Sequence, residues 1–161
     1  MKSIIKLSKI VAAVALLWGT VACEKEDFLI FTATTNDTLS IQNEVQSVYK
    51  LSNATSSNIA ERLVWNTPDF DAPTTVTYVV ELSSDAGFST VNFNSGDTSN
   101  THFGISVANL IEIATTLGLD EDPNTTAADG EPNNAGIIYA RVKAFAGSSS
   151  SGANGALLTS E

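Results

Sequence analysis

The sequence has few of the side chains that catalytic and metal sites commonly use. Its 161 residues include one cysteine and one histidine. A single cysteine cannot form an internal disulfide bond. A single histidine, His102, supplies neither the partners of a catalytic triad nor a histidine-based zinc site. We therefore predict that the chain has no catalytic residues and is not an enzyme.

Basic side chains are also scarce. Eight Lys and Arg residues stand against 18 Asp and Glu residues, which gives a formal net charge of −10. Lys2, Lys6 and Lys9 precede the first apolar run, so a chain without that segment has a charge of 5 − 18 = −13. Nucleic acids and anionic lipid headgroups are bound by clustered Lys and Arg. The composition therefore predicts no nucleic-acid partner.

A long apolar run occurs only at the N-terminus. It covers residues 10–18, follows the three early lysines and precedes the small residues 19–22. A basic start, a short apolar stretch and a small-residue end are the three parts of a secretory signal peptide. The run is shorter than the ~20 residues of a transmembrane helix. Residues 1–22 are therefore predicted to be a signal peptide.

The single cysteine, Cys23, follows this signal directly. Residues 20–23, Thr-Val-Ala-Cys, resemble the lipobox of bacterial lipoproteins, with Thr20 where leucine is most common. The resemblance implies cleavage before Cys23 and lipidation of that residue. Several acyl chains on one residue would anchor the protein stably to a membrane. The alternative is ordinary signal-peptidase cleavage, which leaves a free N-terminal thiol.

Charged residues follow the cysteine at once. Lys25, Glu26 and Asp27 resemble the surface-export signal of outer-membrane lipoproteins, which implies an anchored protein that faces the cell exterior. The alternative is a solvated leader without an export role. Residues 23–37 are predicted to be a lipidated tether, and residues 38–161 a folded domain.

The pattern of this domain is that of an antiparallel β-sandwich. Residues 75–82 alternate apolar and polar side chains, which is the period of a half-buried strand. Further strands separated by turn signals favour a sandwich of the immunoglobulin type, and we expect them at residues 44–51, 61–65, 90–94, 102–105 and 135–145.

One helix is expected within the sandwich, at about residues 106–118. Ser106 can cap its start, and Gly118 can end it in the left-handed conformation. A strand that pairs with residues 135–145 would begin near Leu157 and have almost no length. We therefore expect the final strand to be missing or truncated, and the domain to be incomplete at its C-terminus.

Several stretches in this order resemble the N-terminal region of SusE/SusF-family outer-membrane lipoproteins. They are the lipobox, the acidic leader, residues 65–88 (WNTPDFDAPTTVTYVVELSSDAGF), the helix sequence SVANLIEIATTLGL and the strand sequence ARVKA. The resemblance implies a cell-surface accessory protein of a polysaccharide-utilisation system for starch-like glycans. In that family the N-terminal domain is a spacer and platform for glycan-binding modules, near a TonB-dependent transporter of the SusC/SusD type.

The acidic stretch after the helix offers a different function. Asp120, Asp122, Asn124 and Glu131 occupy positions 1, 3, 5 and 12 of a calcium-binding loop. Thr125 stands where such a loop requires glycine, and an acidic solvated loop is the alternative. A domain that binds Ca²⁺ or a small ligand is thus the alternative function, and a surface adhesion or pilus-type module is a third possibility.

Aromatic side chains do not identify a glycan site. Trp65 and Tyr78 fall on strand faces that we expect to be buried. Sugar binding needs exposed aromatic surfaces with hydrogen-bonding neighbours, and no aromatic cluster at a suitable spacing is evident among Phe70, Phe88, Tyr139 and Phe145. No glycan-binding residue is therefore assigned from the sequence, and carbohydrate binding follows only from the family resemblance.

Overall fold

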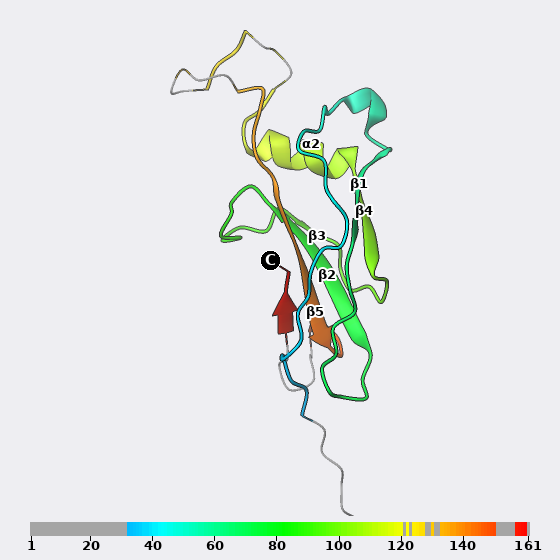
Figure 1. The fold of residues 1–161 in the computed structure, drawn as a ribbon. Helices are drawn as coiled ribbons and strands as arrows, with labels where there is room; N and C mark the ends of the chain where they lie inside the picture. Colours follow the sequence, from blue (N-terminus) through cyan, green and yellow to red (C-terminus); the bar gives the residue numbers. More distant parts are fainter. Residues whose placement is uncertain are drawn as a thin grey trace, which may run out of the picture. The chain divides into compact units, whose positions relative to one another are not determined.

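The computed structural model describes residues 32–120, 122, 124–127, 130, 133–150 and 157–160. They belong to one compact unit, Phe31–Glu161. The described residues are mainly β and form two antiparallel sheets and one short α-helix. Figure 1 shows how these elements are arranged. The predicted antiparallel β-sandwich is therefore confirmed. Within the described residues, no helix has the length and apolar character needed to cross a membrane.

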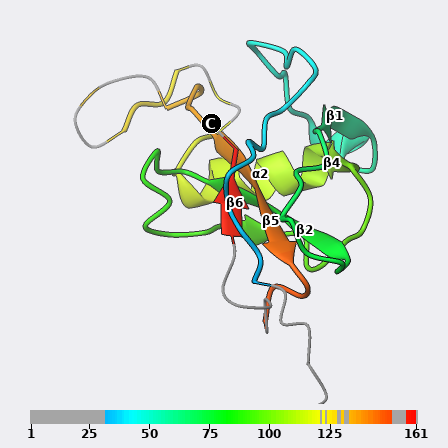
Figure 2. The same ribbon diagram turned by 60° about the horizontal axis from the view of Figure 1, so that its bottom comes forward.

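The larger sheet has four strands in the order β3-β2-β5-β6. Their bounds are Phe93–Asn94 for β3, Val76–Ser83 for β2, Tyr139–Ala146 for β5 and Leu157–Thr159 for β6. The two central strands, β2 and β5, pair over their full lengths. By contrast, β6 pairs with only three residues of β5, and Figure 2 shows it as a short strand beside β5. The strand expected near Leu157 is thus present as the three-residue β6.

The smaller sheet consists of β1 (Ile59–Val64) and β4 (His102–Ser106). Ile41 forms an isolated bridge with Trp65, just beyond the end of β1. The pairing of β1 with β4, and of β2 with β5 and β6, matches the B–E and C–F–G pairings of immunoglobulin-like sandwiches. A 3-10 helix, η1 (Asn53–Thr55), precedes β1.

The helix α2 (Val107–Thr116) follows β4 without a loop, because Ser106 ends the strand and caps the helix. The Ser106 hydroxyl accepts a hydrogen bond from the Asn109 N–H at 3.2 Å, and the Asn109 side chain accepts one from the Ser106 N–H at 3.0 Å. This reciprocal pair satisfies main-chain donors of the first turn. Gly118 has a φ of 74°, the left-handed conformation predicted for the end of the helix.

The core lies between the two sheets, and α2 packs against it. Its buried residues include the inward positions of both central strands, Leu63 of β1 and one face of the helix. Trp65 and Tyr78 meet there with ring centroids 5.5 Å apart, so both are buried as predicted. The two sheets and the helix therefore pack around one shared core.

The strand predicted at residues 44–51 is wrong, since this segment forms no strand. The side-chain amide of Asn43 accepts from the Val64 N–H at 2.8 Å and donates to the Arg62 carbonyl at 3.0 Å. The Asn43 side chain thus bonds main-chain groups at the edge of β1 that would otherwise bond to a neighbouring strand. Val45 and Val48 remain exposed as a result. Two other strands begin later than predicted, at Phe93 for β3 and at Tyr139 for β5.

Candidate functional site

The predicted anchor and export signal lie outside the described residues. Cys23, Lys25, Glu26 and Asp27 all precede residue 32, where the description begins. Lipidation at Cys23 and export through the three charged residues therefore stay predictions. The candidate sites below belong to the folded domain.

The calcium-loop residues lie in the segment that follows α2. The Thr125 hydroxyl lies 2.7 and 2.8 Å from the two carboxylate oxygens of Asp120, and the Asn133 side chain donates to the same carboxylate at 3.0 Å. The bond from Thr125 is the largest cause that lowers the pKa of Asp120 below its usual value. The residue found in place of the expected glycine therefore binds the carboxylate itself.

Of the other predicted calcium ligands, Asp122 meets this carboxylate through its main chain, because its N–H donates to Asp120 Oδ1 at 2.9 Å. Asp122 accepts hydrogen bonds from the main-chain and side-chain nitrogens of Asn124, both at 2.9 Å, and Glu131 lies outside the described residues. In the described part of the chain, no group of three or more His, Cys, Asp or Glu side chains could hold a metal ion. The calcium site stays a prediction from the sequence.

The structure brings Phe88 to a face of β5 with which the sequence did not connect it. Tyr139, Arg141, Lys143 and Phe145 occupy every second position of β5, on the side of the four-stranded sheet that faces away from the core. The Arg141 guanidinium lies over the Phe88 ring, 4.1 Å from its centroid. We call these five residues the outer face. Phe70, in contrast, is buried in the core.

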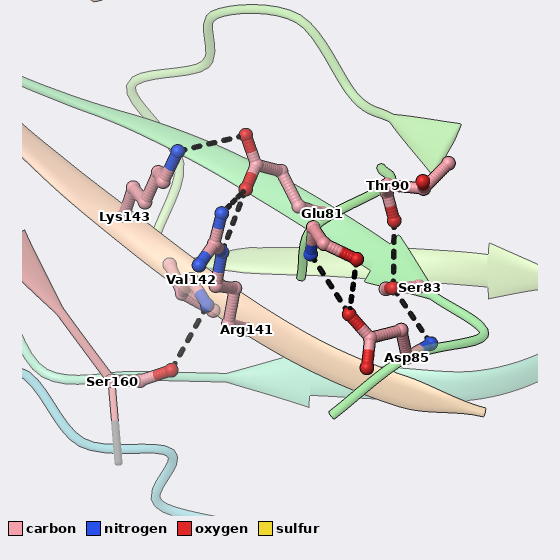
Figure 3. A network of polar contacts seen from close by, with 9 residues as sticks. Glu81, Ser83, Asp85, Thr90, Arg141, Val142, Lys143 and Ser160 are labelled. Atoms are coloured by element: carbon pink, nitrogen blue, oxygen red, sulfur yellow. Dashed lines mark hydrogen bonds and ion pairs between the residues drawn. The ribbon is translucent and has the colours of Figure 1, made fainter. Parts of the chain in front are cut away.

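A buried carboxylate organises the basic side chains of the outer face, as Figure 3 shows. Glu81 is 5% exposed, and it accepts a hydrogen bond from Arg141 Nε at 2.7 Å and one from Lys143 Nζ at 3.0 Å. Burial by itself raises the pKa of Glu81, but the bonds from Lys143 and Arg141 outweigh it and hold this pKa below its usual value. The three side chains form a fixed network with a net charge of +1.

The loop before β3 holds Phe88 against this network. Phe88 has a φ of 50°, which is uncommon for a bulky residue. The Asp85 carboxylate accepts from the N–H groups of Gly87 at 3.2 Å and Ser89 at 2.9 Å, and from the Ser89 hydroxyl at 2.6 Å. These bonds fix the turn that presents the ring to Arg141. A strained residue held in this way is a reason to look for function.

The outer face can therefore stack and hydrogen-bond a ligand. Aromatic rings and a guanidinium offer flat surfaces, and the remaining donors of Arg141 and Lys143 can bind oxygen atoms. The placement of two aromatic and two basic residues at every second position of β5 was readable in the sequence. The contribution of Phe88 was not, because it depends on how the loop before β3 folds.

A second candidate site is an apolar groove of about 1300 Å³. It lies between residues 41–53, the helix α2 and residues 134–140. On its wall the Tyr49 hydroxyl donates to Glu61 Oε2 at 2.5 Å, and the Gln46 N–H donates to the same oxygen at 3.1 Å. Burial and then the neighbouring Glu61 carboxylate raise the pKa of Tyr49 to about 12. This pair fastens the segment without a strand to β1.

Comparison with known sequences gives one family. The family described as SusE outer membrane protein matches residues 24–143, which is well over half of the chain. No curated protein and no solved structure gave a match. The matched region begins one residue after Cys23 and includes the described strands β1 to β4, the helix α2 and most of β5.

Proposed function

Because the chain belongs to the SusE outer membrane protein family, we propose that it is a non-catalytic platform domain at the cell surface. Cys23 carries the lipid that anchors it to the outer membrane. Lys25, Glu26 and Asp27 direct it to the exterior. The domain holds glycan-binding modules of a polysaccharide-utilisation system next to a SusC/SusD-like TonB-dependent transporter.

The observation that carries this proposal is the position of the family match. It starts at residue 24, directly after Cys23, the first residue of the predicted mature chain. The predicted anchor and the matched family region are therefore adjacent, with no space for another domain between them. A platform next to a membrane needs a rigid body close to its anchor, and the sandwich core begins at Leu39.

The experiment compares the full chain with its Cys23→Ala variant in a Gram-negative host that exports surface lipoproteins. Cells are labelled with an alkyne fatty acid and fractionated, and intact cells are treated with protease. We expect the label, outer-membrane fractionation and protease sensitivity for the full chain, and loss of the label and of membrane attachment for Cys23→Ala. An unlabelled chain, or equal membrane attachment of the variant, would contradict the anchor.

The export signal needs a variant of its own. Replacement of Lys25, Glu26 and Asp27 by alanine should leave the fatty-acid label intact but protect the protein from external protease. Alanine replacement of Thr35 and Asn36 in the same tether provides the matched control. If the triple alanine variant is cleaved as fast as the control, these three residues do not direct export.

The outer face supports a second candidate function, which is direct glycan binding by this domain. The observation that favours it is the Phe88 ring under Arg141, on the face of β5 that also carries Tyr139, Lys143 and Phe145. Affinity electrophoresis in gels that contain soluble starch would test it. We expect retardation of the full chain and its loss in a Tyr139→Ala, Phe88→Ala double variant. Equal mobility with and without starch would exclude this function.

A further inference from the structure

The outer face is a basic surface on a strongly acidic chain. The predicted mature chain has five basic residues against 18 acidic ones, and two of the five, Arg141 and Lys143, lie on this face. Glu81 is the only acidic residue in the four described strands of the sheet. The other residues that pair with the outer face are uncharged, namely Thr77, Val79, Ser83, Leu157 and Thr159. The net charge of +1 on the network of Glu81, Arg141 and Lys143 is therefore not cancelled by a neighbouring strand.

Glu81 leaves several hydrogen-bond donors of its two partners unused. Both Nε and Nη2 of Arg141 lie 2.7 Å from Glu81 Oε2, and Lys143 Nζ lies 3.0 Å from Glu81 Oε1. A guanidinium has five N–H groups and an ammonium has three. Among the described residues, neither cation has a further hydrogen-bond partner. The remaining N–H groups can therefore bind the oxygen atoms of a ligand.

The two cations are held in place by the protein itself, as Figure 3 shows for their bonds to Glu81. Their side chains are only 23% and 22% exposed. The Phe88 ring lies against the Arg141 guanidinium, 4.1 Å from ring centroid to the central carbon. Side chains that are already ordered lose little conformational entropy when a ligand binds. The outer face therefore has the preorganisation of a binding surface.

The shape of the outer face fits a chain molecule. Tyr139 and Phe145 are six positions apart on β5, which is ~20 Å at ~3.4 Å per residue. Arg141 and Lys143 lie between them. Aromatic side chains offer flat apolar surfaces on which the apolar faces of sugar rings can pack. A glycan of several sugars can therefore contact both aromatic residues and the two cations at once.

We propose that the outer face binds a neutral glycan chain that carries isolated carboxylates, as in glycans with scattered uronic acid residues. One carboxylate accepts hydrogen bonds from the unused N–H groups of Arg141 and Lys143. The neutral sugars on either side of it pack against Tyr139 and Phe145. This inference rests on direct glycan binding, the second candidate function above, and adds the charge of the ligand.

Charge explains both the need for a carboxylate and the limit on their number. Hydrogen bonds between ionised partners are about twice as strong as those between neutral ones, so a carboxylate on Arg141 and Lys143 is favoured over a hydroxyl. A single carboxylate balances the net charge of +1 on the network. Further carboxylates would meet the acidic remainder of the chain, whose repulsion extends over a screening length of ~8–10 Å at 0.10–0.15 M salt.

The test measures the affinity of three matched oligosaccharides by isothermal titration calorimetry, with the full chain purified in an uncharged detergent. The first is maltohexaose, the second is the same hexasaccharide with one inner glucose oxidised at C6 to glucuronic acid, and the third has every glucose oxidised in this way. Lys143→Gln removes one cation of the outer face but keeps a donor for Glu81. Lys50→Gln is the matched control, because it removes the same charge from an exposed lysine outside the sheet. Circular dichroism and urea unfolding check that both variants fold.

We expect the full chain to bind the hexasaccharide with one carboxylate about tenfold more tightly than maltohexaose, and the fully oxidised one more weakly than the one with a single carboxylate. Lys143→Gln should lose this preference and keep the affinity for maltohexaose, a pattern that a merely structural role of Lys143 would not produce. Lys50→Gln should keep the preference.

Equal affinity of the full chain for maltohexaose and its single-carboxylate form would overturn the inference and leave direct glycan binding in place. If the full chain binds neither of them, direct glycan binding fails and the inference fails with it. An equal loss of preference in Lys50→Gln would assign the effect to overall charge and overturn the site. Tightest binding of the fully oxidised hexasaccharide would overturn the claim that the carboxylates are isolated.

Discussion

Replacement of Glu81 by glutamine should destabilise the domain by about 2 kcal/mol at pH 7. Loss of one partner from a buried ion pair costs about 3–5 kcal/mol because the other charge stays unpaired. Here the side chains of Arg141 and Lys143 are 23% and 22% exposed, so water compensates in part. Glutamine also keeps one acceptor oxygen, which limits the loss further.

The assay is urea unfolding of the full chain and the variant at pH 7 and at several lower pH values. The folded-state pKa of Glu81 lies below its usual value of 4.5. The stabilisation from its charge is therefore complete above the unfolded-state pKa and is lost as the pH falls through the folded-state pKa. The difference between the full chain and Glu81→Gln should accordingly be largest near neutral pH and vanish in acid.

Glu112→Gln provides the control, since Glu112 is exposed on α2 and should change stability by less than about 0.5 kcal/mol. A Glu81→Gln variant as stable as this control would refute the reasoning. A difference that grows as the pH falls would refute it too, because the sign of the pKa shift would then be wrong.

Three further outcomes are expected. Ile113→Ala should cost about 2–5 kcal/mol in urea unfolding, because Ile113 is completely buried on the side of α2 that faces the core. Leu117→Ala should cost well under half of that, because Leu117 is partly exposed. Gly118→Ala should cost about 1 kcal/mol in the same assay, since its φ of 74° disfavours a side chain. Millimolar Ca²⁺ should leave the Tm unchanged, because Thr125 already binds the Asp120 carboxylate, and a Ca²⁺-dependent rise in Tm would support the calcium loop instead.

The parts of the fold that depend on local signals were predictable from the sequence. The alternation along β2 gave a strand whose inward Tyr78 is buried, and Ser106 and Gly118 marked the two ends of α2. Each of these signals acts within one element. The position of β6 near Leu157 was also predictable, because apolar residues resume there after a stretch rich in Ser, Gly and Asn.

The features that depend on distant contacts were not predictable. Residues 44–51 have the composition of a strand, but the Asn43 amide and the Glu61 carboxylate take up the main-chain bonds there. The outer face requires both the register of β2 with β5 and the turn that places Phe88 over Arg141. These contacts join residues 15 to 70 positions apart and leave no mark in a local pattern.

The most direct test of the central claim is mass spectrometry of the N-terminal peptide from the membrane-bound protein. The claim is that Cys23 attaches this domain to the outer membrane. It predicts that the mature chain begins at Cys23 and that this residue carries acyl chains. A chain that still begins at Met1, or an unmodified Cys23, would contradict it.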